Sequence, residues 1–138
     1  MFNFERRAMK RKFKSEIKVI DEEISRSQRF DFSCCVLTVE INDYIPRGLS
    51  KILPGKVVSF HILKKFIRNY DRMIGPYWRR YYIVLPQTDK KGANIAKERI
   101  YGLAEEHNWG NVSVGMAVYP EDGQDSGTLI DQAIGEMP

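Results

Sequence analysis

The sequence predicts a single α+β domain in which helices flank a mainly antiparallel central sheet. Helical and strand patterns alternate along the 138 residues, and the segment 71–86 is predicted to form a β-hairpin, which joins neighbouring antiparallel strands. The composition, 43% hydrophobic and 29% charged, is that of an ordinary globular domain. No apolar run approaches the roughly 20 residues of a membrane span.

A long amphipathic helix is predicted at the N-terminus, over residues 3–29. Phe13, Ile17, Ile20 and Ile24 form one apolar stripe along it. We therefore divide the chain into a signalling or coiled-coil-type helix at 1–29 and a domain at 30–138. Three interpretations are open: the helix packs on its own domain, it pairs with a second copy or a partner protein, or its basic residues lie against an anionic membrane next to upstream segments.

The net positive charge is confined to this N-terminal segment. Residues 1–30 hold nine Lys and Arg against five Asp and Glu, whereas the rest of the chain holds thirteen of each. The domain that follows is neutral, which argues against a nucleic-acid polymer as its partner.

A central strand is predicted at 33–41, and a loop with several Pro and Gly residues follows at 42–55. Cys34 and Cys35 are adjacent in this strand, so their side chains point to opposite faces of the sheet. We expect buried free thiols rather than a disulfide, in keeping with a cytoplasmic location.

The second half of the chain begins with a helix predicted at 57–70, which leads into the hairpin. The hairpin strands are 72–74 and 80–85, separated by residues 75–79. A helix at 89–107 and a strand at 112–119 follow, and Gly115 inside that strand indicates a close approach of another backbone segment. Ser126 is expected to cap a last helix at 128–137.

Arg68 and Asp71 are spaced as Arg-x-x-Asp, five residues follow, and the second hairpin strand ends in Leu85-Pro86. This order resembles the GGDEF family of bacterial diguanylate cyclase domains, in which a Gly-Gly-(Asp/Glu)-Glu-Phe signature forms the hairpin tip. The strand at 112–119 resembles a strand of that family as well. The resemblance implies a nucleotidyl-cyclase-like sandwich and a role in cyclic di-GMP signalling.

The family signature itself is replaced in this chain. Its position is filled by Tyr77, Trp78, Arg79, Arg80 and Tyr81. Arg80 stands where the family has a metal-binding carboxylate, and Tyr77 and Trp78 stand where it has glycines, so we expect their side chains to fill the substrate space. The resemblance thus implies a degenerate member without diguanylate cyclase activity and without catalytic residues.

Two further features of the altered site follow from the resemblance. Glu40 matches a metal ligand of the family; here it is either a solvent-facing carboxylate or a lone, weak Mg²⁺ ligand, so no metal site is predicted. Trp78, Arg79 and Arg80 either bind a base and a phosphate or form a turn that contacts another protein.

In the family, Arg-x-x-Asp is an inhibitory site that binds cyclic di-GMP. The resemblance therefore implies that Arg68 and Asp71 bind this ligand, together with a second arginine for which Arg72 and Arg99 are candidates. The predicted function is a catalytically inactive cyclic di-GMP receptor that needs no cofactor. The alternative is a ligand-free interaction or dimerisation module derived from a cyclase, and an active cyclase is the third possibility.

Overall fold

A computed structural model describes residues 10–44 and 55–138 of the chain. Residues 10–16 are helical, and the elements that follow are α2 (Lys18–Phe30), β1 (Cys34–Tyr44), α3 (Gly55–Phe66), β2 (Arg72–Tyr77), β3 (Arg80–Pro86), α4 (Lys90–Glu106), β4 (Trp109–Tyr119) and α5 (Ser126–Glu136). The start of the predicted N-terminal helix and most of the loop at 42–55 lie outside the described residues.

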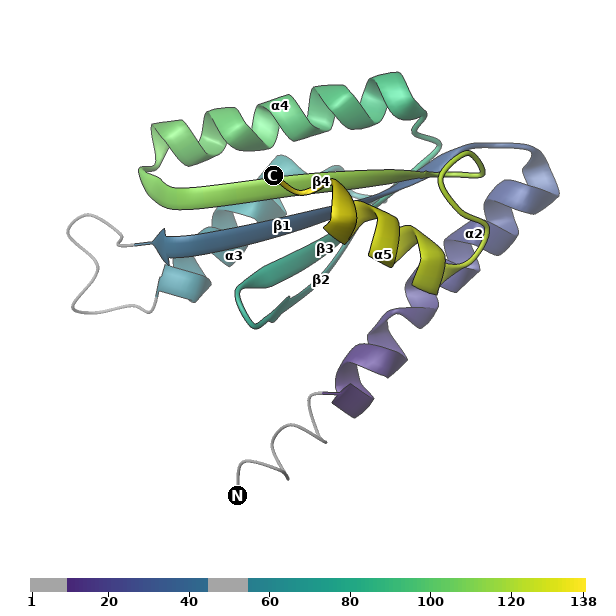
Figure 1. The fold of residues 1–138 in the computed structure, drawn as a ribbon, viewed down its shortest axis with the longest axis horizontal. Helices are drawn as coiled ribbons and strands as arrows, with labels where there is room; N and C mark the ends of the chain where they lie inside the picture. Colours follow the sequence, from purple (N-terminus) through teal and green to yellow (C-terminus); the bar gives the residue numbers. More distant parts are fainter. Residues whose placement is uncertain (1–9, 45–54) are drawn as a thin grey trace.

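The four strands form one sheet in the order β2-β3-β1-β4, and every neighbouring pair is antiparallel. The long central strand β1 runs diagonally through the molecule in Figure 1. Its register with β3 places Glu40 opposite Arg80. The predicted α+β class with a mainly antiparallel sheet is confirmed.

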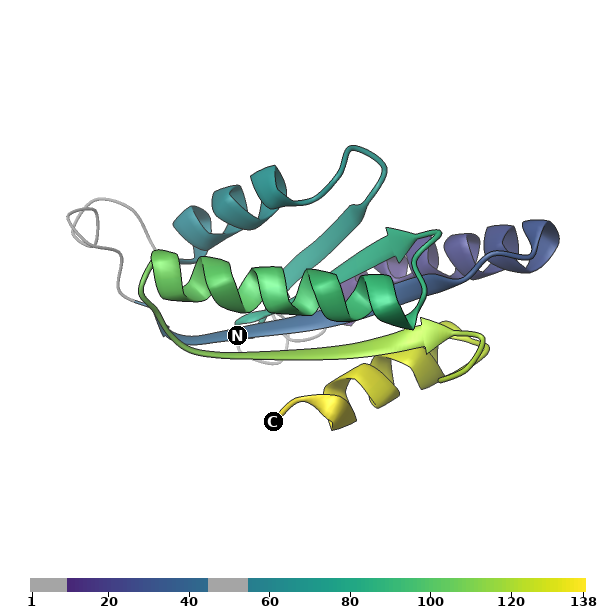
Figure 2. The same cartoon turned by 90° about the horizontal axis from the view of Figure 1, so that it is seen from above.

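The sheet buries both of its faces, because side chains alternate along each strand. Cys35, Leu37 and Val39 of β1 belong to a core under α3 and α4, whereas Cys34 and Val36 belong to a second core under α2 and α5. Figure 2 shows α3 and α4 on one side of the sheet and α5 on the other. Both cysteines are buried free thiols on opposite faces, as the sequence predicts.

The N-terminal helical segment packs on its own domain. Ile20 and Ile24 of the predicted apolar stripe are buried in the second core, and Phe13 and Ile17 pack partly against it. This packing agrees with the first of the three interpretations of the stripe. Pairing with another chain and contact with a membrane remain predictions.

Helix α5 lies directly on β4, and Gly115 makes this possible. A Cβ atom at Gly115 would clash with the carbonyl oxygen of Ala133 in α5. The buried Thr38 hydroxyl of the neighbouring strand donates to the same carbonyl oxygen at 3.3 Å. The close backbone approach expected at Gly115 is therefore confirmed.

The outer edge of β4 is closed by side chains. The backbone N–H of Val114 donates to the Tyr101 hydroxyl at 3.0 Å, and that of Val118 donates to an Asp122 carboxylate oxygen at 2.9 Å. The N–H of Met116, between them, donates to the Glu136 carboxylate. These bonds occupy three successive outward-facing N–H groups that would otherwise be free to pair with another strand.

Several predicted boundaries differ from the structure. Strand β1 extends to Tyr44, so the first three residues of the predicted loop at 42–55 are strand, and α3 begins at Gly55 rather than residue 57. Strand β4 begins at Trp109 rather than residue 112, because the pairing with β1 continues to Tyr44.

Helix α3 ends at Phe66 rather than residue 70, because Arg68 and Asp71 are joined in a turn of their own. Strand β2 extends to Tyr77 through an irregular pairing between Ile74 and Tyr77. The last helix is capped by Asp125, whose carboxylate accepts from the Thr128 N–H at 2.8 Å, and Ser126 is its first residue.

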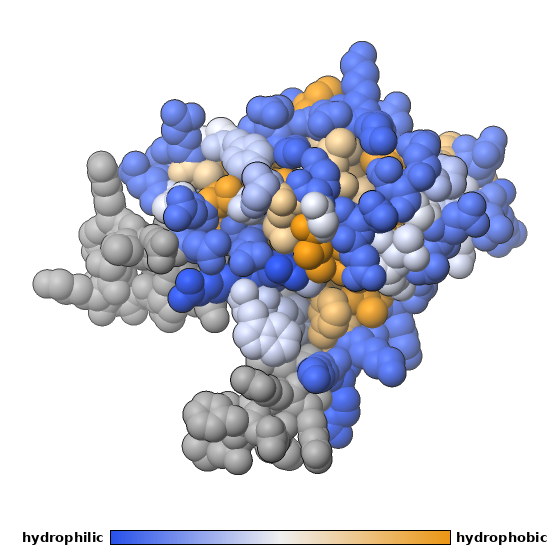
Figure 3. Space-filling model, in the orientation of Figure 1, coloured by the Kyte–Doolittle hydropathy of each residue, from blue (hydrophilic) through white to orange (hydrophobic). Residues whose placement is uncertain are grey.

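The surface carries apolar residues in small groups. On the face seen in Figure 3, hydrophilic residues surround separate small apolar patches. Within residues 10–44 and 55–138, none of the helices combines the length and the apolar character that crossing a membrane requires.

Candidate functional site

Arg68 and Asp71 form a rigid turn just after α3. The Arg68 backbone N–H donates to Asp71 Oδ2 at 2.8 Å, and the Arg68 guanidinium contacts both carboxylate oxygens, with Nε 3.1 Å from Oδ2 and Nη2 3.1 Å from Oδ1. The Asp71 side chain is 2% exposed, whereas that of Arg68 is 46% exposed. The carboxylate therefore fixes a guanidinium that still reaches the solvent.

Three further contacts orient the Arg68 guanidinium. Its Nη2 donates to the Thr88 hydroxyl at 3.1 Å and to the Pro86 carbonyl oxygen at 3.4 Å, and its Cζ lies 4.5 Å from the ring centroid of Tyr70. The hydrogen bonds that Arg68 donates to Asp71 are the main cause that raises the pKa of Arg68 above its ordinary value. The guanidinium is therefore held in one orientation while 46% of the side chain stays exposed.

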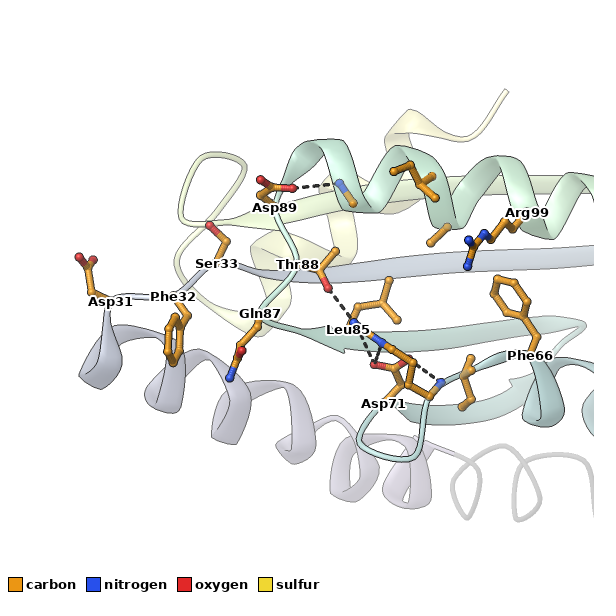
Figure 4. Close-up of a pocket in the computed structure, with 15 residues that line it drawn as sticks. Asp31, Phe32, Ser33, Phe66, Asp71, Leu85, Gln87, Thr88, Asp89 and Arg99 are labelled. Carbon is orange, nitrogen blue, oxygen red and sulfur yellow. Dashed lines mark hydrogen bonds and ion pairs between the residues drawn. The ribbon is translucent and has the colours of Figure 1, made fainter.

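A cavity of about 580 Å³ opens beside this turn. Its walls come from four segments: the junction of α2 and β1, the turn after α3, the loop between β3 and α4, and one side of α4. In Figure 4, Arg99 reaches from α4 toward Phe66, across the cavity from the segment that carries Asp71. Arg68 and Asp71 both line this space.

The structure distinguishes the two candidates for a second arginine. Arg99 lines the cavity with Arg68 and forms no ion pair within the described part of the chain. Arg72 is exposed on β2 and is not among the residues that line the cavity. Spacing along the sequence could not make this choice, because it depends on how α4 lies beside the turn after α3.

The cavity also contains residues that the sequence analysis did not single out as site residues. Phe32, Gln87 and Thr88 line it, and Tyr70 stacks on Arg68. Phe32 lies in a break between helix and strand, and Gln87 and Thr88 lie in a short loop. No local pattern marks these positions as part of a site, since they come together only in the folded chain.

The hairpin that carries the altered signature turns tightly at its tip. Trp78 and Arg79 have left-handed backbone conformations, with φ of 48° and 70°, and the Trp78 side chain is largely exposed. This pair of positive φ values is typical of a two-residue hairpin turn. The indole and the Arg79 side chain therefore project from the end of the hairpin.

Tyr77 takes a different position from the expected one. Its side chain is buried in the second core, where its ring lies 5.1 Å from that of Phe13 and its hydroxyl donates to Glu16 Oε1 at 2.8 Å. The expectation that Tyr77 fills the substrate space is therefore wrong. The register irregularity between Ile74 and Tyr77 interrupts the alternation of β2, so the Tyr77 ring lies on the same face as Ile74, toward the N-terminal helical segment.

Arg80 and Glu40 neutralise each other across β3 and β1. Arg80 Nη2 lies 3.0 Å from Glu40 Oε2, and both side chains are about a quarter exposed. The described residues contain no group of three or more His, Cys, Asp or Glu side chains able to hold a metal ion. A Glu40 carboxylate that is already paired with a guanidinium does not fit a divalent cation.

The fold was compared with those of known proteins. No protein-family model matches the sequence, and no curated protein matches it. Among solved structures, a diguanylate cyclase protein from Thermotoga maritima superposes with a TM-score of 0.73 at 16% identity, over 91% of this chain and 94% of that one.

Two other solved structures are similar. The GGDEF domain of DgcB from Caulobacter crescentus, in complex with c-di-GMP, gives a TM-score of 0.69 at 10% identity, covering 89% of this chain and 78% of that one. The diguanylate cyclase SiaD from Pseudomonas aeruginosa, in complex with its activator SiaC, gives 0.72 at 17% identity, covering 90% of this chain and 52% of that one. These proteins share the architecture described above, and the chain has the fold of a GGDEF domain.

Proposed function

We propose that this chain is a catalytically inactive GGDEF-fold signalling domain that binds cyclic di-GMP in the cavity beside Arg68. The observation that carries the proposal is the placement of Arg68, fixed by Asp71, and Arg99 on the walls of one cavity. The similar DgcB structure holds c-di-GMP. The fold relationship and the retained Arg-x-x-Asp together favour this ligand over other nucleotides.

The chemistry of the site suits a guanine nucleotide. An arginine presents a planar set of donors that matches guanine O6 and N7 or a phosphate, and Arg68 is held in one orientation by Asp71 and Tyr70. Arg99, free of an ion pair within the described residues, adds a second positive charge for the phosphates. The ligand therefore meets two cations, one of which is already positioned.

We infer the absence of cyclase activity from the residues of the hairpin. Phosphoryl transfer between nucleotides needs metal ions that neutralise the reacting phosphates. The Arg80 guanidinium occupies the position of the metal-binding carboxylate and is paired with Glu40. We expect no cyclic di-GMP when the purified protein is incubated with GTP and Mg²⁺ and the products are separated by chromatography. Formation of the product would contradict this part of the proposal.

Calorimetric titration of cyclic di-GMP into the purified protein tests the binding. We expect micromolar or tighter affinity, lost in Arg68→Ala and weakened about ten-fold or more in Arg99→Ala, since each removes a charged hydrogen-bond donor. Arg72→Ala is the matched control, because Arg72 is exposed and lies outside the cavity lining. An equal loss of affinity in all three variants would contradict the assignment of Arg99 as the second arginine of the site.

A second candidate function is a ligand-free module that contacts another protein. Its specific support is Trp78, which is 57% exposed at the tip of a tight hairpin beside Arg79. Large aromatic side chains and arginines are enriched in protein interfaces. A folded wild-type protein that binds no cyclic di-GMP would favour this alternative, with either the hairpin tip or the N-terminal helical segment as the contact to a partner or a second copy.

The cellular location follows as part of the proposal. We place the domain in the cytoplasm, where cyclic di-GMP signalling takes place. The two buried free thiols, Cys34 and Cys35, suit a reducing compartment.

A further inference from the structure

The cavity has two chemically different ends. Arg68 and Arg99 provide positive charge on the walls formed by the turn after α3 and by α4. The other end is formed where α2 joins β1 and where β3 leads into α4, and it carries Phe32 and Gln87. Figure 4 shows Phe32 and Gln87 at this end, away from Arg99, and the Asp31 carboxylate directed away from them. This end offers an aromatic ring and an amide, and it suits a neutral planar group with hydrogen-bond donors.

Phe32 is held in place by the end of α2. Asp31 adopts a left-handed conformation with φ of 59°, and the Phe32 backbone N–H donates to the Ser27 carbonyl oxygen at 2.9 Å. The ring itself is 43% exposed although it lines the cavity. An exposed ring on a fixed backbone is a platform on which a base can stack, because little conformational freedom is lost when the base arrives.

Gln87 lies in the loop between β3 and α4, and its backbone is held in place. Its φ of 49° is unusual for a residue other than glycine, and such strained positions gather at binding sites. The next residue ties the loop down: the Thr88 N–H donates to the Ser33 carbonyl oxygen at 3.1 Å. Within the described residues, the Gln87 amide has no hydrogen-bonding partner, so it is available to a ligand.

We propose that Phe32 and Gln87 form a second base subsite that takes the second guanine of a two-base nucleotide. The inference rests on the proposed function, since the first guanine and the phosphates occupy the end with Arg68 and Arg99. The Phe32 ring stacks on the second base, and the Gln87 amide oxygen accepts from the N1–H or N2–H donors of guanine. A single ligand thereby contacts both the Arg-x-x-Asp turn and the C-terminal end of α2.

Paired calorimetric titrations with cyclic di-GMP and with GMP test the subsite on the full chain. Phe32→Ala is expected to weaken cyclic di-GMP binding about ten-fold or more, because one stacked base is lost. GMP binding is expected to stay unchanged, because a mononucleotide occupies the Arg68 end alone. Phe32→Tyr keeps the ring and is expected to bind cyclic di-GMP like the wild type.

Trp78→Ala is the matched control. The Trp78 side chain is an aromatic ring, 57% exposed, that does not line the cavity, so its removal should leave both affinities unchanged. The subsite is refuted if Phe32→Ala leaves cyclic di-GMP binding intact, or weakens GMP binding equally, while Arg68→Ala still abolishes binding. If the wild-type protein binds neither nucleotide, the proposed function fails, and the subsite fails with it.

Discussion

At the scale of single residues, two side chains decide how the altered signature is accommodated. Arg80 pairs with Glu40 at the surface, and Tyr77 turns inward to Glu16 and Phe13. The first contact leaves the Glu40 carboxylate paired with a cation, and the second joins the hairpin to the N-terminal helical segment. Both side chains therefore have a structural role in this chain.

Tyr77→Phe tests the link between the hairpin and the helical segment. Removing the hydroxyl leaves the Glu16 carboxylate without its 2.8 Å donor, so we expect a loss of about 1 kcal/mol in the free energy of unfolding, measured by urea denaturation. Tyr119→Phe is the control, because no hydrogen bond of that hydroxyl is found within residues 10–44 and 55–138. An equal effect of both variants would contradict the assigned contact.

The raised pKa of the buried Glu23 carboxyl makes the stability of the fold depend on pH. Burial raises the pKa of this carboxyl above its ordinary 4.5, and Arg26, with Nη1 3.5 Å from Oε2, opposes the shift only in part. A raised pKa means that the folded protein binds the proton more tightly than the unfolded chain. The charged carboxylate therefore lowers stability at neutral pH, and this cost disappears as the pH falls through the raised pKa toward 4.5.

Glu23→Gln should accordingly increase the free energy of unfolding at pH 7, with a gain that shrinks as the pH approaches the ordinary carboxyl pKa of 4.5. Urea denaturation at a series of pH values measures this gain in the free energy of unfolding. Glu22→Gln, at an exposed position of the same helix, should change little at any pH. If the Glu23→Gln variant is less stable than the wild type at pH 7, the Arg26 contact outweighs burial.

At the scale of elements, the packing of α5 on β4 depends on one glycine. Gly115→Ala is expected to lower the free energy of unfolding by about 1–3 kcal/mol, because the added methyl group meets the Ala133 carbonyl and pushes the helix away. Gly102→Ala in α4 is the matched control: its Cβ would meet open space, and helix propensity predicts a gain of about 0.5–1 kcal/mol. The free energies of unfolding of the two variants, measured by thermal or urea unfolding, should change in opposite directions.

The helices and strands also show which features can be predicted from the sequence and which cannot. Alternation and turn residues were sufficient for the strands, the hairpin and the opposite faces of Cys34 and Cys35, because these depend on the local chain. The capping of α5 was assigned to Ser126 rather than Asp125, since either residue type caps helices and only the backbone conformation decides. The inward turn of Tyr77 depends on a partner about sixty residues away in sequence.

At the scale of the whole molecule, the site combines predicted and unpredicted parts. Arg68 and Asp71 were found from their spacing, whereas the choice of Arg99 over Arg72 required the position of α4. The cavity brings together four segments spread from Asp31 to Arg99, one of which is the end of α2. Under the proposed function, a ligand bound there contacts the end of α2, which belongs to the predicted signalling helix at 1–29.

The most direct test of the central claim is an NMR titration of the ¹⁵N-labelled protein with cyclic di-GMP. We predict that the largest chemical-shift changes occur at the backbone amides of Arg68, Asp71 and Gln87, while the Trp78 indole signal at the hairpin tip stays in place. Changes centred on Trp78, or unchanged spectra at saturating ligand, would contradict the account of this domain as a cyclic di-GMP receptor.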